Sequence, residues 1–291
     1  MSLTRIASQK LAATISAHGA ELVALERADG TPLLWNGDAA WWTGRAPLLF
    51  PIVGRVPNDE ILVEGRRFPL KQHGFARTSD FTCIAATAES CRFRLAASAQ
   101  SQAAYPFCFA LTAHYEIADA TLICRVEVTN EEPHRGMPFS FGFHPAFLWP
   151  LPPDTSRDGH DLIFSHAETT AIGRPDEGLL GAARQANPVS AERRLPLSDA
   201  LFEEGALIFD TLASNAITYR NSIGESLLIS FENLPHLGIW TKPGAPFVCI
   251  EPWHGFAAPH GFAGELAQKP GIIRLPAGGT MAFTMRITIA V

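Results

Sequence analysis

Basic residues are in short supply in this chain. Its 291 residues include 23 Lys and Arg against 29 Asp and Glu, which gives a formal net charge of −6. Nucleic acids and anionic membranes bind surfaces with clustered Lys and Arg. The charge balance therefore argues against a nucleic acid or a membrane as the main partner.

Cysteine is also scarce, and its spacing forms no recognisable pattern. The protein has five cysteines, whose separations match neither a zinc site nor a disulfide framework. An odd number without such a pattern predicts reduced and mostly buried thiols, as in a cytoplasmic protein. These residues are Cys83, Cys91, Cys108, Cys124 and Cys249.

Long apolar runs are missing as well. The start, from Met1 to Arg5, lacks the apolar core of a signal peptide. No apolar run approaches the roughly 20 residues of a membrane helix. Hydrophobic residues still make up 47% of the chain, which is enough for a sizeable buried core. We therefore expect a soluble cytoplasmic protein.

Strand patterns dominate the sequence, and helical periodicity is rare. Alternating or apolar runs such as 122–128 are separated by short turn sequences. A hairpin is expected where 237–241 and 246–250 flank Lys242-Pro243-Gly244-Ala245, because Pro-Gly suits the centre of a type II turn. Only 198–209 has the pattern of a short helix, beginning at Ser198 or Asp199.

These patterns predict one all-β domain that spans residues 1–291. Two packed antiparallel sheets, in a sandwich, are the architecture that such strands favour. Residues 150–196 are rich in Pro, Asp, Ser and Arg and weak in periodicity. Because strand-like patterning resumes afterwards, we interpret them as a long excursion over the surface rather than a linker.

A histidine at the end of one predicted strand has open space beside it. In residues 137–144, a period of two places Phe139, Phe141 and Phe143 on one face of the strand. The small residues Ser140 and Gly142 then share the opposite face with His144. The phenylalanines would fill the core, and the groove beside His144 would suit a polar ring. A packed histidine that merely ends a strand is the equally weighted alternative.

A glutamate has a similarly suggestive setting. Glu251 follows the apolar run 247–250 and precedes Pro252 and Trp253. Partial burial between Ile250 and Trp253 would raise the pKa of the carboxyl toward values useful for a general base. Trp253 also suits stacking against the apolar face of a sugar. The alternative is a surface glutamate beside a turn proline.

Other candidate binding residues lie in turns or at the ends of apolar runs. His73 is in a turn next to Gly74, and Arg77 follows four residues later. Arg55 ends the run 46–53, where an arginine either pairs with a carboxylate or forks onto ligand hydroxyls. Asp210 follows 207–209 and is a candidate acceptor for two sugar hydroxyls, or else a cap or turn residue.

Four segments together resemble the aldose 1-epimerase family, the galactose mutarotase-like proteins, and in particular their bacterial mutarotase-like branch. The order Arg55, His73, His144 and Glu251 is part of that resemblance, which spans most of the chain. Residues 150–196 fit typical members of the family poorly. The matching segments are 47–55, 72–77, 138–147 and 238–255.

The resemblance implies a β-supersandwich fold, with neither a metal nor an organic cofactor. By the same resemblance, His144 is the acid at the sugar's ring oxygen and Glu251 is the base at the anomeric hydroxyl. His73 and Arg55 would position the substrate, and Asp210 would be the family's hydroxyl-binding aspartate. Histidine and glutamate are readily tuned to such acid and base roles near neutral pH.

The leading hypothesis is therefore a mutarotase that interconverts the α and β anomers of a hexose. A close variant acts on hexose 6-phosphates, because Arg55, Arg77 and Lys71 supply positive charge. A carbohydrate-binding or sensing protein without turnover is a second class. A glycosidase is a third, but it needs two carboxylates about 5–10 Å apart, and only Glu251 has a convincing setting. The expected partner is a small sugar, and the oligomeric state stays open between a monomer and a homodimer.

Overall fold

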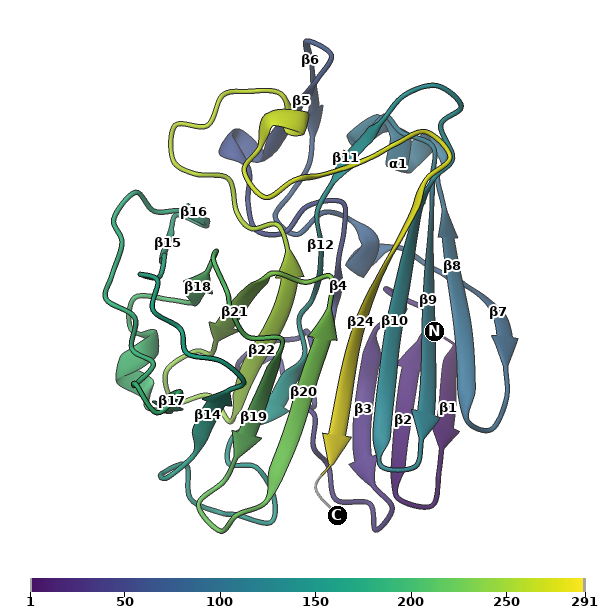
Figure 1. Ribbon diagram of the computed structural model, residues 1–291. Coiled ribbons are helices and arrows are strands. Elements are labelled where there is room, and N and C mark those ends of the chain that lie inside the picture. Colours follow the sequence, from purple (N-terminus) through teal and green to yellow (C-terminus); the bar gives the residue numbers. More distant parts are fainter. Residues whose placement is uncertain (1, 290–291) are drawn as a thin grey trace.

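The largest sheet in the structure, a computed structural model that describes residues 2–289, has nine antiparallel strands. Their order is β17-β14-β19-β20-β24-β10-β9-β8-β7. The long strand β24 (Thr280–Ile289) joins the two halves because it pairs with β20 on one side and β10 on the other, as Figure 1 shows. The other strands are β7 (Thr82–Ala86), β8 (Ser90–Ala96), β9 (Phe109–Ala118), β10 (Thr121–Asn130), β14 (Asp161–Phe164), β17 (Arg194–Pro196), β19 (Ala216–Arg220) and β20 (Ser226–Glu232).

A second sheet of six strands positions the candidate site. It has the order β18-β21-β22-β12-β4, and β13 also pairs with β22. These strands are β4 (Leu48–Leu49), β12 (Phe141–Phe143), β13 (Ala146–Leu148), β18 (Leu207–Phe209), β21 (His236–Trp240) and β22 (Phe247–His254).

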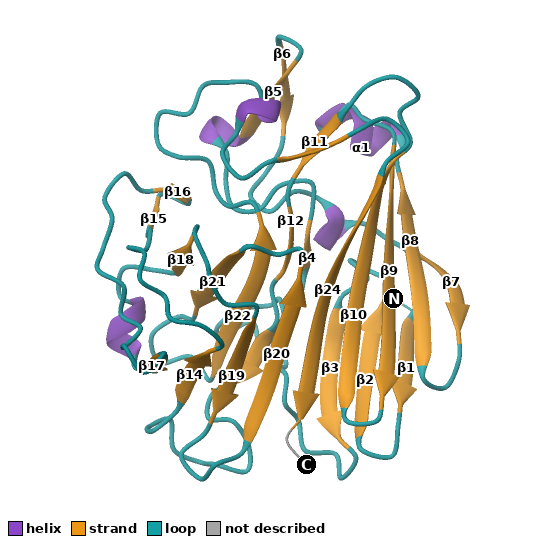
Figure 2. Ribbon diagram, in the orientation of Figure 1, coloured by secondary structure: helices purple, strands orange, loops and turns teal. Residues whose placement is uncertain are grey.

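Smaller elements surround the two sheets, and Figure 2 shows how little of the chain is helical. One three-stranded sheet and three two-stranded pairs complete the β-structure. The strands are β1 (Leu3–Ala7), β2 (Leu11–Ser16), β3 (Leu22–Arg27), β5 (Glu60–Val63), β6 (Arg66–Pro69), β11 (Met137–Phe139), β15 (Pro175–Asp176), β16 (Leu179–Leu180) and β23 (Ile273–Leu275). The helical elements are α1 (Ala99–Ala104) and the 3₁₀ turns η1 (Pro57–Asp59), η2 (Ala76–Thr78), η3 (Asp199–Phe202) and η4 (Leu266–Gln268).

Aromatic side chains join the six-stranded and nine-stranded sheets into a sandwich. Phe141 of β12 stacks on Phe283 of β24 with ring centroids 4.8 Å apart, and Phe164 of β14 lies 5.4 Å from Phe209 of β18. All four rings are buried, and such pairs add packing energy beyond the area they bury. The predicted all-β fold with large antiparallel sheets is confirmed. That residues 1–291 form one domain stays a prediction.

The alternation of β22 decides what faces the sandwich core. Val248 and Ile250 point into the main hydrophobic cluster between the sheets. Phe247, Cys249 and Trp253 belong to two separate apolar clusters on the opposite face. Successive side chains of a strand point to opposite faces. Glu251 therefore also lies on the face directed away from the main core.

The structure confirms one local prediction and corrects two. The 237–250 hairpin forms, and its turn is closed by a 2.9 Å bond from the Ala245 N–H to the Lys242 carbonyl, with Gly244 at φ 82° as type II requires. The helix predicted at 198–209 is wrong: only the turn η3 is helical. The chain reverses at Gly205, φ 83°, and continues as β18, whose pairing with β21 outweighs weak helical periodicity.

The prediction that 150–196 is merely an excursion over the surface is wrong in part. Within it, β14 and β17 extend the nine-stranded sheet, and the short hairpin β15–β16 reaches the candidate site. These strands have two to four residues each. Such short strands are too brief to show a clear period of two in the sequence.

Candidate active site

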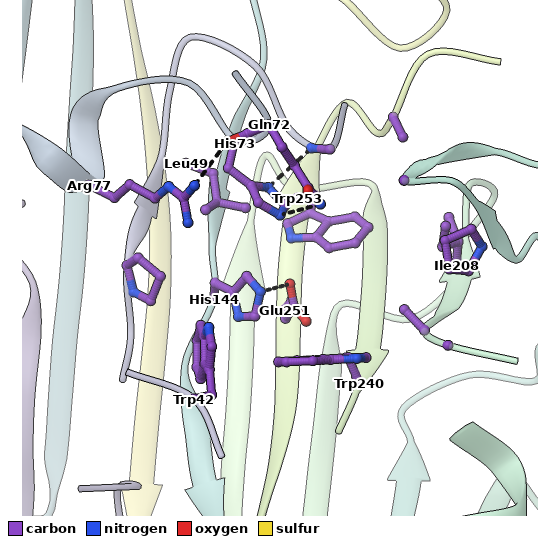
Figure 3. Close-up of a pocket in the computed structure, with 17 residues that line it drawn as sticks. Trp42, Leu49, Gln72, His73, Arg77, His144, Ile208, Trp240, Glu251 and Trp253 are labelled. Carbon is purple, nitrogen blue, oxygen red and sulfur yellow. Dashed lines mark hydrogen bonds and ion pairs between the residues drawn. The ribbon is translucent and has the colours of Figure 1, made fainter. Parts of the chain in front are cut away.

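Side chains on the face of the six-stranded sheet opposite the main core line a cavity of about 320 Å³ (Figure 3). The strands β4, β12, β21 and β22 form its floor, and the turn that contains His73 forms one wall. The hairpin β15–β16 and the segment before β18 form the opposite wall. The cavity thus brings together segments far apart in the sequence.

Trp253 lies flat on this floor because its neighbours have no side chains. A Cβ atom at Gly142 would lie 2.5 Å from the indole Cδ1, and one at Gly238 would lie 2.3 Å from Cη2. These glycines stand on the strands on either side of β22. An indole that lines the cavity beside a polar site suits stacking against the apolar face of a sugar.

The centre of the cavity holds a buried histidine–glutamate pair. His144 Nε2 lies 3.1 Å from Glu251 Oε2, and the two side chains are 9% and 2% exposed. Register explains the meeting: Gly142 of β12 pairs with Trp253 of β22, so the chain leaving β12 brings His144 beside Glu251. One atom of an imidazole and one of a carboxyl therefore face each other at the cavity floor.

Burial is the main influence on the ionisation of the pair. It raises the pKa of the Glu251 carboxyl well above its ordinary value and lowers the pKa of His144 to about 3. Both shifts favour a carboxylic acid beside a neutral imidazole. An imidazolium beside a carboxylate contains the same number of protons. The pair can thus place one transferable proton on either partner.

Aromatic rings, rather than a second hydrogen bond, hold the imidazole of His144. Its Nδ1 is buried and has no hydrogen-bond partner among residues 2–289. Trp42 packs on the ring at a centroid distance of 4.9 Å and an interplanar angle of 30°. The rings of His73 and Trp240 meet it edge-on at 5.7 and 6.0 Å. This packing keeps Nε2 directed at Glu251.

A tight turn delivers His73 to the cavity as a neutral donor. His73 adopts φ 66°, and a Cβ at the following Gly74 would lie 2.2 Å from the Phe50 carbonyl oxygen, so only glycine fits there. The Gly54 N–H donates to His73 Nδ1 at 3.2 Å, which leaves the ring proton on Nε2. Burial, together with the charges of His144 and Arg77, lowers the pKa of His73 well below its usual value.

Arg77 also reaches the cavity, from the 3₁₀ turn η2. One of its terminal nitrogens donates to the Gln72 carbonyl at 3.2 Å. Its Nε is buried and has no hydrogen-bond partner within the described part of the chain. Burial lowers the pKa of the guanidinium, which remains charged at any physiological pH. Arg77 thus offers donor capacity to a ligand.

Two predicted binding residues are instead engaged in ion pairs beside the cavity. Arg55 donates two hydrogen bonds to the Asp59 carboxylate, at 2.8 and 3.1 Å, and a third to the Glu177 carbonyl at 3.0 Å. Asp210 accepts two bonds from Arg184, at 2.8 and 2.5 Å. Neither lines the cavity, so a binding role for either stays a prediction. The predicted residues that do line it are His73, Arg77, His144, Glu251 and Trp253.

One group of side chains has the spacing of a metal site. A sulfur, a nitrogen and an oxygen of Cys249, His144 and Glu251 lie within 4.8 Å of one another. Burial raises the pKa of the Cys249 thiol well above its usual value, which opposes the thiolate that a metal requires. The expected independence from metals stays a prediction, which activity in EDTA would check.

Sequence patterns did not identify several residues of the cavity. Trp240 pairs with Cys249 across the predicted hairpin, so its register could have placed it on the same face as Glu251. Gln72 precedes His73 and was not assigned a role. Trp42 lies in a loop without periodicity, and Ile208 lies within the segment that was wrongly predicted to be a helix. For these last two residues, no sequence signal pointed to the site.

Comparisons with known proteins identify the family. The family model described as "Aldose 1-epimerase" matches residues 2–288, so this chain belongs to the aldose 1-epimerase family. The plasmid-encoded protein LacX of Lactococcus lactis subsp. lactis is 30% identical over 280 residues, which cover 93% of this chain and 94% of the relative. The predicted resemblance is confirmed.

Solved structures of similar proteins have the same fold. A galactose mutarotase-related enzyme from Lactobacillus acidophilus superimposes with a TM-score of 0.93 at 29% identity and covers 100% of this chain and 98% of its own. A galactose mutarotase-like protein from Lactobacillus casei gives a TM-score of 0.92 at 28% identity, covering 99% and 100%. The galactose mutarotase-like fold expected from the sequence is thus confirmed.

The glycine beneath the indole provides a test of the floor. We expect Gly142→Ala to push Trp253 out of position and to destabilise the protein by about 1–3 kcal/mol, as overpacking usually does. Urea unfolding and Trp fluorescence would measure the effect. Gly136→Ala is the matched control, since its Cβ would meet only the Leu275 carbonyl at an ordinary 3.6 Å. Equal stability of the two variants would contradict the packing described.

Proposed function

We propose that this protein is an active aldose 1-epimerase, a mutarotase that interconverts the α and β anomers of a hexose through the open-chain aldehyde. The observation that carries the proposal is the 3.1 Å pair of His144 and Glu251 at the cavity floor. The two oxygens bonded to an anomeric carbon are close neighbours. Ring opening needs an acid that protonates the ring oxygen and a base that deprotonates the anomeric hydroxyl, both in place at the same time. A facing imidazole and carboxyl supply that combination.

The ring opens by a balanced transfer of protons. Glu251, as carboxylate, takes the proton of the anomeric hydroxyl, while His144, as imidazolium, gives a proton to the ring oxygen. The bond between C1 and the ring oxygen breaks, and an aldehyde forms. Rotation about the C1–C2 bond presents the other face, and the reverse transfers close the ring and restore both side chains.

The rest of the cavity supports this chemistry. Trp253 offers an aromatic face to the ring, and His73, Gln72 and Arg77 supply donors for hydroxyls. Burial around the pair strengthens its hydrogen bonds to the reacting oxygens. General acid and general base each typically contribute about 10²–10⁴-fold, which is enough for a reaction already measurable in water.

Two alternative functions have different support. A sugar-binding protein without turnover would not need the facing acid and base. A glycosidase needs two carboxylates across the bond, but Glu251 is the sole carboxylate that lines this cavity among residues 2–289. We therefore favour the isomerase. Within the same range of residues, no helix is long and apolar enough to cross a membrane, and a cytoplasmic location stays a prediction.

Removing either member of the pair should abolish most of the activity. We expect Glu251→Gln and His144→Ala each to lower the rate of anomer exchange by about 10²–10⁴-fold, measured by NMR on free hexoses. Glu116→Gln, on an exposed position of β9, is the control and should keep full activity. Near wild-type exchange in either folded site variant would show that the assigned roles are wrong.

The pH profile should show that the pair is buried. The active pair contains one transferable proton, and a second proton on His144 stops the reaction. Because burial lowers the pKa of His144 to about 3, activity should not fall between pH 7 and 5, and its acid limb should lie well below pH 6.5. Activity should fall at high pH, when the pair loses its proton. Half-maximal kcat/KM near pH 6.5, with the fold intact by circular dichroism, would contradict the lowered pKa of His144.

Arg77 tests whether the sugar is phosphorylated. If the substrate is a hexose 6-phosphate, Arg77→Ala should weaken binding by about 1.5–3 kcal/mol, and wild-type binding should fall as salt rises. We favour a neutral hexose, because a net charge of −6 does nothing to attract a dianion. For a neutral hexose, the substitution should matter less and salt should have little effect.

Titration calorimetry with a free hexose and its 6-phosphate would measure both effects. Arg92→Ala, at an exposed position of β8, is the control. Exchange of the 6-phosphate alone, slowed by salt, would reverse the preference for a neutral sugar.

A further inference from the structure

The indole N–H of Trp240 is a donor in the cavity without a partner. Trp240 lines the cavity and is half-buried, and its nitrogen is accessible rather than enclosed. No atom of residues 2–289 accepts a hydrogen bond from it, whereas Trp35 and Trp149 donate to carbonyls at 2.8 and 2.9 Å. The indole nitrogen of Trp253 is instead buried. Of the two hairpin tryptophans that line the cavity, Trp240 is therefore the one whose N–H can reach a ligand.

Three neighbouring aromatic rings hold the indole of Trp240 in place. Its ring centroid lies 5.5 Å from that of Trp42, 5.7 Å from that of Phe247 and 6.0 Å from that of His144. Trp240 stands on β21, and the neighbouring strand β22 carries Glu251. Figure 3 shows the indole near Glu251, with its nitrogen in the half of the ring that is farther from His144. The N–H thus occupies a defined position beside the histidine–glutamate pair.

The elements on this side of the cavity bring no other side-chain donor to it. Among residues 2–289, Trp240 is the sole side-chain donor that β18, β21 and the hairpin β15–β16 contribute to the lining. Gln72, His73 and Arg77, which supply donors for other hydroxyls, come from the turn on the opposite wall. The remaining lining residues of these elements and of the segment before β18 have no polar side chain: Pro175, Gly178, Gly205, Ala206 and Ile208.

A sugar that covers Trp240 has to replace the water at this N–H. A donor that loses its water without gaining an acceptor costs free energy, whereas a donor that exchanges water for a ligand oxygen gains modestly. A pyranose carries hydroxyl oxygens around its ring, and each of them can accept such a bond. The N–H of Trp240 therefore favours a sugar that places a hydroxyl at this position over an analogue that lacks it.

We infer that Trp240 is a specificity-determining residue, whose indole N–H donates a hydrogen bond to one hydroxyl of the sugar other than the anomeric hydroxyl. The inference rests on the proposed function, because that function places a sugar in this cavity with its anomeric hydroxyl at Glu251. A hydrogen bond between neutral groups contributes a factor of about 2–10 to an equilibrium or rate constant. That factor sets the scale of the discrimination.

A cycle of one variant and a panel of sugars tests the inference. Trp240→Phe keeps an aromatic ring and removes the N–H. We would measure kcat/KM for anomer exchange by NMR with the better substrate of D-glucose and D-galactose and with its 2-, 3-, 4- and 6-deoxy counterparts. The smaller ring lowers every rate by a common factor, so the loss from wild type to variant is compared between sugars. We expect one deoxy sugar to lose about 2–10-fold less than its parent.

The outcomes separate this inference from the proposed function. An equal loss for all sugars would mean that Trp240 only packs against them, which overturns the inference and leaves the mutarotase intact. If the folded wild type exchanges no sugar, the proposed function fails, and dissociation constants from titration calorimetry replace kcat/KM in the same cycle. Equal weakening of all sugars, or no binding of any, would then overturn the inference as well.

Trp35→Phe is the matched control. Trp35 belongs to the apolar cluster against which Trp240 packs, but it does not line the cavity. We expect this variant, if folded by circular dichroism, to change kcat/KM by the same factor for every sugar. The same sugar-dependent loss in Trp35→Phe would show that a shift of the cluster, rather than the missing N–H, sets the preference.

A measurement on the wild type alone gives an independent check. The chain has six tryptophans, whose indole N–H signals are resolved by NMR of the ¹⁵N-labelled protein. We expect one of these signals to move when the parent sugar binds and to move less with the deoxy sugar that the cycle identifies. Indole signals that respond alike to every sugar would overturn the inference.

Discussion

The register between β21 and β22 is the constraint on which the whole site depends. It pairs Gly238 with Glu251 and Trp240 with Cys249, so that the carboxyl and both tryptophans of the hairpin share the face opposite the main core. Because the side-chain period of a strand is two, a slip by one residue would turn Glu251 into the sandwich core and bring Ile250 to the cavity. Two features oppose such a slip. The type II turn from Lys242 to Ala245 sets the register, and the burial of Val248 and Ile250 in the main core would be lost.

Burying an acid and a base together costs stability, and the packing of the surrounding side chains offsets that cost. An unpaired buried carboxylate is strongly unfavourable, but a carboxyl that shares a proton with an imidazole can remain neutral. Trp42, His73 and Trp240 close around the imidazole, so water does not replace its contact with Glu251. The same enclosure gives the pair its chemical use, because a sugar that enters meets a fixed acid and base. Glycines at positions 142 and 238 then leave room for Trp253 to form a flat floor under the sugar.

The sequence predicted those features that rest on local patterns. Alternation predicted the strands and the placement of His144 on the same face as Gly142. The Pro-Gly turn predicted the hairpin that carries Glu251. Features set by contacts between distant segments could not be predicted in this way. Arg184 forms a salt bridge with Asp210, and Asp59 forms one with Arg55. Both depend on the geometry of turns, which the periodicity of the sequence does not reveal. The helix predicted at 198–209 failed because β18 pairs with a strand distant in the sequence: Phe209 pairs with Leu237, 28 residues later. Trp42 comes from a loop with no pattern. The alternation of 139, 141 and 143 is also interrupted, since β11 pairs with β23 and β12 with β22 on either side of Ser140.

The central claim is that the pair opens the sugar ring at the bond between C1 and the ring oxygen. Anomer exchange in water enriched in ¹⁸O, followed by NMR and mass spectrometry, measures that bond directly. If His144 and Glu251 act as described, the protein interconverts the anomers many times before any ¹⁸O enters the anomeric position beyond the uncatalysed background. Incorporation of ¹⁸O at the rate of anomer exchange would mean that the bond to the anomeric hydroxyl breaks instead, and it would contradict the account.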